Sequence, residues 1–492
     1  MENNSNYSTE QHSASQTETE TLNYDNFHGE YKFFIRQYIL PILGIPSSSK
    51  IEDYPFKTNA GHNWKMASFD RESGILSFNA GGIKYFYIKP PIGLNDDSEN
   101  LAINLAQAFT KMSEYSYRIT KDGSLPSKKS HSSLFSSPIT RDAIYQMAIQ
   151  KGICSWVIGG KNDSVEELIS ALERWSVQTY EGKRVTFGFV INPEATANEK
   201  LPRDAWISFM KNDYAAVFTD SIHSLIELDA DCQFASFLSL TKGGTVDSYD
   251  LTPRLPIRFA HSIRQYVNTN NAVGLFLLNN GDIIISKKAQ IRFIKRNLRW
   301  LNFSFDAFYN AAKSFSDSTN GIDTLLEEVY ATVLDVSLAH TGGIIAIVQD
   351  INELCATNGQ ESDLNPYDNL LCEDIIDNTG QDKDSGQGKN KERVEMLKLK
   401  RSIVKALINE KTFVNTDRKL RCELAAMDGA CILTTDGRFI AAGAIIRNQA
   451  GSSGGGRSAA SEKLSKYGMA VKISTDGYVE LYIKEKLTYI IR

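Results

Sequence analysis

The sequence predicts an α/β protein with two folded regions behind an N-terminal tail. At 492 residues the chain is too long for one ordinary core. Its 42% hydrophobic and 10% aromatic residues are typical of a globular protein. Apolar stretches alternate between the periods of strands and helices. We expect a disordered tail over residues 1–28, an N-terminal α/β region over residues 29–310 and a C-terminal domain over residues 311–492.

The tail is rich in Ser, Asn, Thr, Gln and Glu, which is the composition of a disordered segment. It lacks the basic start and the apolar run of a secretion signal. No apolar run in the chain approaches the roughly 20 residues that a membrane helix needs. We therefore expect a soluble, cytoplasmic protein with no membrane partner.

Cysteines and net charge restrict the classes of function further. The six cysteines never form a C-x-x-C pair, and none of the seven histidines stands near them at ligand spacing. They are expected to be reduced cytosolic thiols. A formal net charge of −5 argues against a protein that binds bulk nucleic acid. A local basic pocket for one small nucleotide remains compatible with that charge.

The N-terminal region opens with predicted strands. Aromatic and aliphatic residues alternate over Ile75–Asn79 and Ile83–Ile88, with glycine-containing turns between them. The serine-rich, basic stretch Ser124–Ser137 is typical of an exposed loop. It places a boundary between two subdomains near residues 125–138.

Helices and strands alternate after this loop. We expect a helix over Arg141–Lys151, a short apolar strand over Ile153–Ile158, a second helix over Ser164–Tyr180 and a strand over Val185–Ile191. The spacing Ser164-Val-Glu-Glu167 is that of a capping box at the start of the second helix. This order is typical of a β-α-β arrangement.

Gly159-Gly160-Lys161 stands between the expected strand and the capped helix. Such a turn could cradle a phosphate, but it lacks the full spacing of a phosphate-binding loop. A plain connection between two elements is the other interpretation.

Further strands are expected over Ala215–Phe218 and Ser224–Asp229. A hairpin should follow, with strands Gly274–Leu278 and Asp282–Ser286. Asn279-Asn280-Gly281 joins them, and these residue types tolerate the positive φ of a tight turn.

The next segment, Ile291–Trp300, contains four basic residues, Arg292, Lys295, Arg296 and Arg299. A solvated basic face is the favoured interpretation, and a phosphate-facing strip is the alternative.

The C-terminal domain begins with an apolar helical pattern over Gly321–His340 that leads into a buried strand, Gly343–Val348. The polar segment Cys355–Arg393 has too little apolar surface to hold a core, so we expect a disordered insert there. A lysine-rich helix is expected near Glu395–Ile408, followed by strands and turns to Arg492.

Three short motifs follow one another in this domain: His340-Thr341-Gly342-Gly343, Asp428-Gly429-Ala430 with a hairpin behind it, and Gly454-Gly455-Gly456-Arg457-Ser458. In order and spacing they resemble the entry strand, the Asp-Gly-Ala signature and the Gly-Thr-Arg-His-Arg loop of diadenylate cyclase domains. The resemblance extends from about Leu325 to Arg492. It implies a mixed, twisted sheet flanked by helices, and an adenine nucleotide as ligand.

The chemistry of these residues agrees with that resemblance. A carboxylate followed by glycine, as at Asp428, can hold Mg²⁺ or Mn²⁺ against phosphate oxygens or accept a proton from a ribose hydroxyl. A glycine-rich loop that leads into a helix presents free N–H groups to phosphate, and Arg457 adds a charge-assisted contact. Asp428 is thus the candidate metal ligand, and the catalytic residue if the domain is active. The candidate nucleotide-binding residues are Thr341, Gly429, Ala430, Gly454, Gly455, Gly456, Arg457 and Ser458.

The sequence also departs from the cyclase pattern. Met427 replaces the histidine before Asp-Gly-Ala, and Gly456-Arg457-Ser458 replaces Arg-His-Arg. Ser474-Thr475-Asp476-Gly477 stands where cyclases have Ser-Glu-Glu-Thr-Gly, and no histidine follows His340. Fewer cations and metal ligands would stabilise the transferred phosphoryl group, so we expect binding to survive better than catalysis.

The whole chain also resembles the DACNV-type sensor relatives of these cyclases, through the Asp282–Trp300 segment, the His-Thr-Gly-Gly entry and the degenerate triplet. This implies a sensor of ATP or a cyclic dinucleotide in bacterial nucleotide signalling or anti-phage defence, with a homo-oligomer and an effector protein as expected partners. The alternatives are an active cyclase that condenses two ATP molecules between facing protomers, and a scaffold with a relic cyclase fold.

Overall fold

The computed structural model describes residues 28–55, 66–80, 84–121, 138–159, 163–198, 200–202, 205–221, 223–239, 256, 267, 272–288, 290–315, 322–355, 363–365, 368–371, 387–446 and 455–492. The chain divides into two compact units. The first comprises Met1–Pro90, Leu94–Glu167 and Leu298–Trp300, and the second comprises Pro91–Gly93, Leu168–Asn297 and Leu301–Arg492. Residues 168–297 thus belong with the C-terminal strands, whereas the sequence places boundaries near 125–138 and at 310. Most of the expected tail and the Ser124–Ser137 loop lie outside the described residues.

The first unit contains a four-stranded antiparallel sheet in the order β1-β4-β3-β2. Two of its strands confirm the predicted strands near residues 75 and 83. The elements of this part are η1 (Ile35–Ile39), α2 (Leu40–Ile42), β1 (Ile51–Pro55), β2 (Ala67–Asp70), β3 (Ile75–Ala80), β4 (Lys84–Ile88), α3 (Asp96–Lys121) and α5 (Pro138–Ile158).

The expected strand Ile153–Ile158 is wrong, because these residues form the last part of α5. Their apolar side chains are buried in a helix, and a short apolar run cannot distinguish a buried helix from a buried strand. α5 packs closely on α3, since a Cβ at Gly152 would lie 2.9 Å from Leu105 Cα. Gly159 ends the helix with φ +75°, so the suspected phosphate turn does not follow a strand. Gly160 and Lys161 lie outside the described residues.

Residues 163–302 supply a seven-stranded mixed sheet in the order β13-β12-β11-β10-β7-β8-β9. β7 and β8 are parallel, and the other described strand pairs of this sheet are antiparallel. The elements are α6 (Asp163–Ser176), β5 (Thr179–Tyr180), β6 (Lys183–Arg184), β7 (Phe187–Ile191), α7 (Ala205–Met210), η2 (Asp213–Val217), β8 (Ser224–Leu228), β9 (Phe234–Ser239), β10 (Val273–Leu277), β11 (Ile283–Lys287), β12 (Gln290–Arg296) and β13 (Arg299–Asn302).

Of two predictions for this part of the chain, one is confirmed and one is wrong. The hairpin across Asn279-Asn280-Gly281 is confirmed: β10 and β11 pair antiparallel, and Gly281 has φ +89°. The strand expected over Ala215–Phe218 is wrong, because these residues belong mostly to the 3₁₀ helix η2. Four residues that include two alanines carry no strand preference strong enough to decide the matter.

The basic segment on β12 is not a solvated face. Lys295 is 8% exposed and pairs with Glu173, while Arg296 is 2% exposed and pairs with Asp282 at 2.5 Å. Both favoured and alternative interpretations are therefore wrong for these two residues. Lys295 and Arg296 are instead buried and paired with acidic residues that lie elsewhere in the sequence, and no local pattern reveals such partners.

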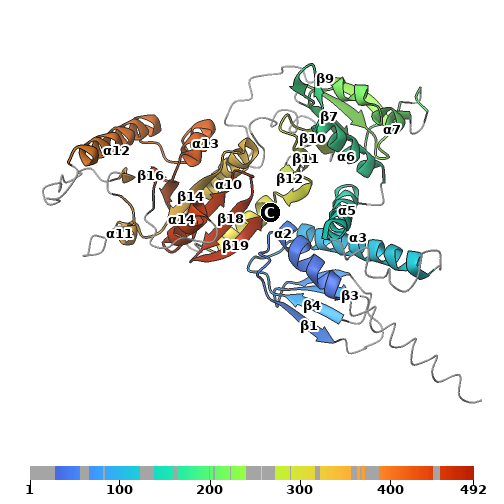
Figure 1. Ribbon diagram of the computed structural model, residues 1–492, viewed down its shortest axis with the longest axis horizontal. Helices are drawn as coiled ribbons and strands as arrows, with labels where there is room; N and C mark the ends of the chain where they lie inside the picture. The colour runs from blue at the N-terminus through green and yellow to red at the C-terminus, as the bar shows by residue number, and fades with distance from the viewer. Residues whose placement is uncertain are drawn as a thin grey trace, which may run out of the picture. The chain divides into compact units, whose positions relative to one another are not determined.

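The C-terminal part forms a six-stranded mixed sheet in the order β16-β15-β14-β17-β18-β19 (Figure 1). β14 is parallel to β15 and antiparallel to β17. The elements are α9 (Phe305–Lys313), α10 (Ile322–Ala339), β14 (Gly343–Val348), α11 (Ile351–Leu354), α12 (Gln387–Ile408), α13 (Arg418–Ala426), β15 (Ala430–Thr434), β16 (Phe439–Ala444), α14 (Gly456–Ser465), β17 (Gly468–Ile473), β18 (Val479–Ile483) and β19 (Lys486–Ile491). The protein is thus of mixed α/β class, with antiparallel and mixed sheets flanked by helices.

Apolar burial and ion pairs hold the helices on this sheet. β14, β15 and β16 share a buried apolar cluster with α14 and with residues before α12. α13 is tied to α10 by Arg418 with Asp335, at 2.7 Å, and by Arg421 with Glu328, at 2.5 Å. None of the described helices is long and apolar enough to span a bilayer.

Parts of the expected disordered insert are packed, so that expectation is wrong for residues 363–365 and 368–371. Leu364 is 1% exposed within the apolar cluster, and Leu370 N donates to Ile440 O on β16 at 2.7 Å. Asp363 accepts a hydrogen bond from Tyr467 and pairs with Lys463. α12 also begins inside the insert, at Gln387. A few apolar residues suffice to pack a segment whose average composition is polar.

Replacing Leu364 with alanine should reduce the free energy of unfolding by about 2–3 kcal/mol, the usual effect of truncating a buried leucine. Urea unfolding followed by circular dichroism measures this. Leu407, which is 53% exposed on α12, is the matched control, and Leu407→Ala should change stability by less than about 0.5 kcal/mol. Equal effects of the two substitutions would show that residues 363–365 do not pack on the sheet.

Candidate functional site

The candidate residues meet at one edge of the six-stranded sheet. Gly343 on β14 pairs with Ile473 on β17, and Ile345 pairs with Cys431 on β15. The amino ends of β14 and β15 therefore lie beside the carboxyl end of β17. We call this the site edge; its loops are Thr341–Gly342, Asp428–Gly429 and Ser474–Tyr478.

The amino end of α14 lies at the same edge. α14 packs on β14 and β17, and Lys472 on β17 donates from Nζ to Ser458 Oγ in the first turn of α14 at 2.7 Å. Gly455 is the N-cap residue, with φ +82°, and as a glycine it has no side chain of its own to cap the helix. The amino terminus of a helix carries partial positive charge and is complementary to an anion.

Arg457 points toward the loop before β14. Its Nη1 lies 2.9 Å from the position that a Cβ on Gly342 would occupy. The same position lies 3.1 Å from Ile473 O and 3.1 Å from Thr475 N, so Gly342 lets these groups approach one another. Among the described residues, Arg457 has no ion-pair partner. Its charge is thus available at the site edge.

A partly buried polar cluster of Lys472, Glu480 and Tyr482 adjoins the first turn of α14. Lys472 Nζ, besides its bond to Ser458, pairs with Glu480 at 2.8 Å, and Tyr482 OH donates to the same carboxylate at 2.8 Å. Burial, and then the hydrogen bond to Glu480, raise the pKa of Tyr482. The side chain of Lys472 is only 15% exposed. The cluster therefore places a second cation next to the helix terminus.

Sequence reasoning missed this second cation. The only signal was one lysine inside the otherwise apolar strand Gly468–Ile473, where a charged side chain is unusual unless it is paired.

Asp428 is exposed in the turn between α13 and β15. Gly429 has φ +111°, and Ala430 begins β15 fully buried. The described residues contain no group of three or more His, Cys, Asp or Glu side chains that could hold a metal ion. Water and the phosphates of a bound nucleotide could supply further oxygen ligands to an Mg²⁺ or Mn²⁺ ion at Asp428.

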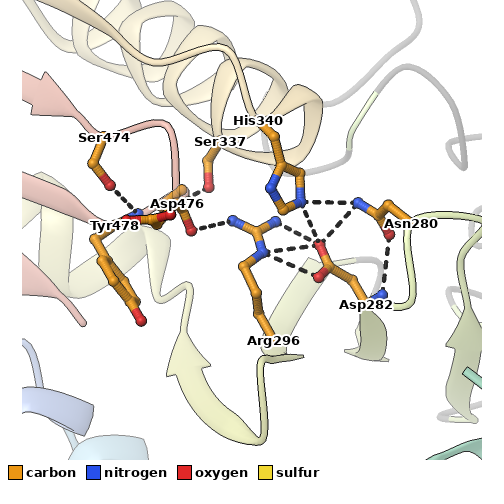
Figure 2. A network of polar contacts seen from close by, with 9 residues as sticks. Asn280, Asp282, Arg296, Ser337, His340, Ser474, Asp476 and Tyr478 are labelled. Carbon is orange, nitrogen blue, oxygen red and sulfur yellow. Dashed lines mark hydrogen bonds and ion pairs between the residues drawn. The ribbon is translucent and has the colours of Figure 1, made fainter. Parts of the chain in front are cut away.

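The loop Ser474–Tyr478 belongs to a larger polar network (Figure 2). Arg296 Nη1 donates to Asp476 O at 3.0 Å, and Ser337 Oγ donates to Gly477 O at 2.7 Å. Asp282 accepts from Arg296 Nε and lies 3.2 Å from His340 Nε2. These contacts connect the seven-stranded sheet and the end of α10 to the site edge.

The structure brings most of the predicted residues together. Thr341, Gly429 and Ala430 stand at or beside the amino ends of β14 and β15, and Gly455, Gly456, Arg457 and Ser458 form the start of α14. Gly454 lies outside the described residues.

Comparison of the chain with protein-family models, with curated proteins and with solved structures finds no match.

Proposed function

We propose that the site edge binds the phosphate groups of a nucleotide. The observation that carries this proposal is the position of Arg457 in the first turn of α14, at the positive end of the helix, without an ion-pair partner among the described residues. A helix amino terminus and a guanidinium are complementary to phosphate in charge and hydrogen bonding. Lys472 adds positive charge from β17.

The resemblance to diadenylate cyclase domains gives the proposed ligand its chemical class. ATP or a cyclic dinucleotide offers phosphates for α14, and Asp428 could hold a phosphate-bound Mg²⁺ or Mn²⁺. In this proposal the domain is a degenerate cyclase-like sensor of bacterial nucleotide signalling or anti-phage defence. It would act in the cytoplasm and pass its state to an effector protein, with a homo-oligomer as a further proposed partner.

Arg457→Ala should weaken nucleotide binding by about 1.5–3 kcal/mol, because it removes a charge-assisted hydrogen bond to phosphate. Isothermal titration calorimetry with ATP and with cyclic di-AMP measures the change. The matched control is Arg438→Ala: Arg438 is half-exposed in the turn after β15, at the other end of that strand, and should leave affinity unchanged. Lack of binding to the unaltered protein, or equal losses in both variants, would contradict the proposal.

We also propose that diadenylate cyclase activity is absent. Phosphoryl transfer depends on positioning, metal ions and nearby cations, and Gly456 and Ser458 replace two cationic positions of the cyclase triplet. Gly456→Arg alone should not restore activity, because residues that act as a unit are strongly non-additive. Incubation with ATP and Mg²⁺ or Mn²⁺, followed by separation of the products, tests this. Multiple turnovers of a cyclic dinucleotide, abolished by Asp428→Asn, would make the enzyme the better interpretation.

A further inference from the structure

Arg296 forms a salt bridge with Asp282 and also contacts the backbone of Asp476. Two of its nitrogens bind Asp282: Nε lies 3.1 and 3.0 Å from the two carboxylate oxygens, and Nη2 lies 2.5 Å from Oδ2. The third, Nη1, donates to the backbone carbonyl of Asp476 at 3.0 Å (Figure 2). The side chains of the pair are 2% and 3% exposed. A fully engaged, buried guanidinium thus joins β12 to the turn between β17 and β18.

The turn between β17 and β18 is shaped to receive this guanidinium. Gly477 has φ +79°, and a Cβ there would lie 1.5 Å from Arg296 Nη1, so only glycine allows the contact. Within the turn, Gly477 N donates to Ser474 O at 2.9 Å and Tyr478 N donates to Ser474 Oγ at 3.1 Å. Thr475 N, in the same turn, and Arg457 Nη1 lie 3.1 and 2.9 Å from the position that a Cβ on Gly342 would occupy. Arg296 therefore contacts a short, hydrogen-bonded turn, and Arg457 lies near Thr475 of the same turn.

We propose that Arg296, held by Asp282, is a positioning residue that fixes the Ser474–Tyr478 turn and, through it, the side chain of Arg457. The proposal rests on the proposed phosphate-binding function of Arg457. It gives the seven-stranded sheet a role at the site edge, because its β11–β12 hairpin sets the position of Arg457, which lies on helix α14. His340, which lies 3.2 Å from Asp282 and 3.0 Å from Asn280 Nδ2, steadies the same carboxylate at the end of α10.

The experiment compares two double variants in the full chain. Asp282→Leu/Arg296→Met removes both charges together, which leaves no unpaired buried charge and so keeps the protein folded. Lys295→Met/Glu173→Leu is the matched control, because Lys295 is the neighbouring residue on β12 and also forms an ion pair, with side chains that are 9% and 27% exposed. A cooperative thermal melt of each variant establishes that it is folded.

The first readout is amide hydrogen exchange without ligand. The Asp282→Leu/Arg296→Met variant should exchange faster over residues 474–478 and 455–459, and the control variant should not. Unchanged exchange at residues 474–478 would overturn the proposal whether or not any nucleotide binds. Faster exchange in a protein whose unaltered form binds no ATP would support the positioning of the turn while refuting the proposed function.

The second readout is ATP affinity in a double-mutant cycle with Arg457→Ala. The Asp282→Leu/Arg296→Met variant should bind ATP about 3- to 30-fold more weakly, the usual range for coupling through a packed network. In the Arg457→Ala background the same change should have little further effect, because its influence passes through Arg457. Fully additive losses would overturn the link between the turn and Arg457, since a merely structural effect would persist in either background.

Discussion

Replacing Asp282 with alanine should reduce the free energy of unfolding by about 3–5 kcal/mol, because it leaves the Arg296 guanidinium buried without its counter-charge. Few substitutions outside an apolar core have so large an effect. The Arg296 side chain is 2% exposed, so water cannot replace the lost carboxylate without opening the contact between β12 and the Ser474–Tyr478 turn. Urea unfolding followed by circular dichroism measures the change.

Two controls separate the burial of the charge from the loss of an ion pair as such. Arg438→Ala breaks a pair whose side chains are 57% and 58% exposed, and should alter stability by less than about 0.5 kcal/mol. Asp282→Leu/Arg296→Met should be much closer to the unaltered protein than Asp282→Ala, because no charge remains unpaired. If Asp282→Ala costs less than about 1 kcal/mol, the pair is not buried in solution as the structure has it.

Gly429→Ala should destabilise the protein by about 3–5 kcal/mol, since it combines backbone strain with a steric clash. Gly429 has φ +111°, a conformation that residues with a Cβ rarely adopt. The added Cβ would lie 2.5 Å from Gly443 C and 2.7 Å from Ala444 O, which are backbone atoms near the end of β16 and cannot rotate away. The register Ala430↔Ala444 would have to open.

The control for this substitution is Gly456→Ala in the first turn of α14. A Cβ there meets nothing within 4 Å and the residue has no positive φ, so stability should change by less than about 0.5 kcal/mol. Thermal melts of both variants test the contrast. If Gly429→Ala melts at the same temperature as the protein without the substitution, β15 and β16 are not held in this register. The expected result would mean that the glycine of Asp-Gly-Ala is required by packing, whatever the site binds.

Local chemistry explains which parts of the fold could be predicted. The Asn279-Asn280-Gly281 turn and the apolar helix Gly321–His340 carry their signals within a few residues, and both are present, the helix as α10. Ile153–Ile158 carries no such signal, because the same apolar run suits a buried helix and a buried strand.

Partners that are far away in the sequence explain the rest. The burial of Lys295 depends on Glu173, which lies 122 residues earlier, and that of Arg296 depends partly on Asp476, which lies 180 residues later. For the candidate site, the motifs near Thr341, Gly429 and Arg457 were visible in the sequence. Lys472 was not, because its importance comes from its contact with α14. Ser474–Gly477 was visible only as a departure from the cyclase pattern, and its contact with Arg296 on β12 could not be predicted.

The connection between β12 and the β17–β18 turn also has a consequence for synthesis on the ribosome. Asp282 and Arg296 are only 14 residues apart, so their hairpin can pair soon after it emerges. The Asp476 carbonyl lies 180 residues after Arg296, and strand β17, which pairs with β14, also lies far downstream, so both are synthesised much later. Contacts of such long sequence separation form last, so a nascent chain that has not passed Tyr478 has its β11–β12 hairpin but no completed site edge. The phosphate binding proposed for this edge would therefore begin only after Tyr478 has been synthesised.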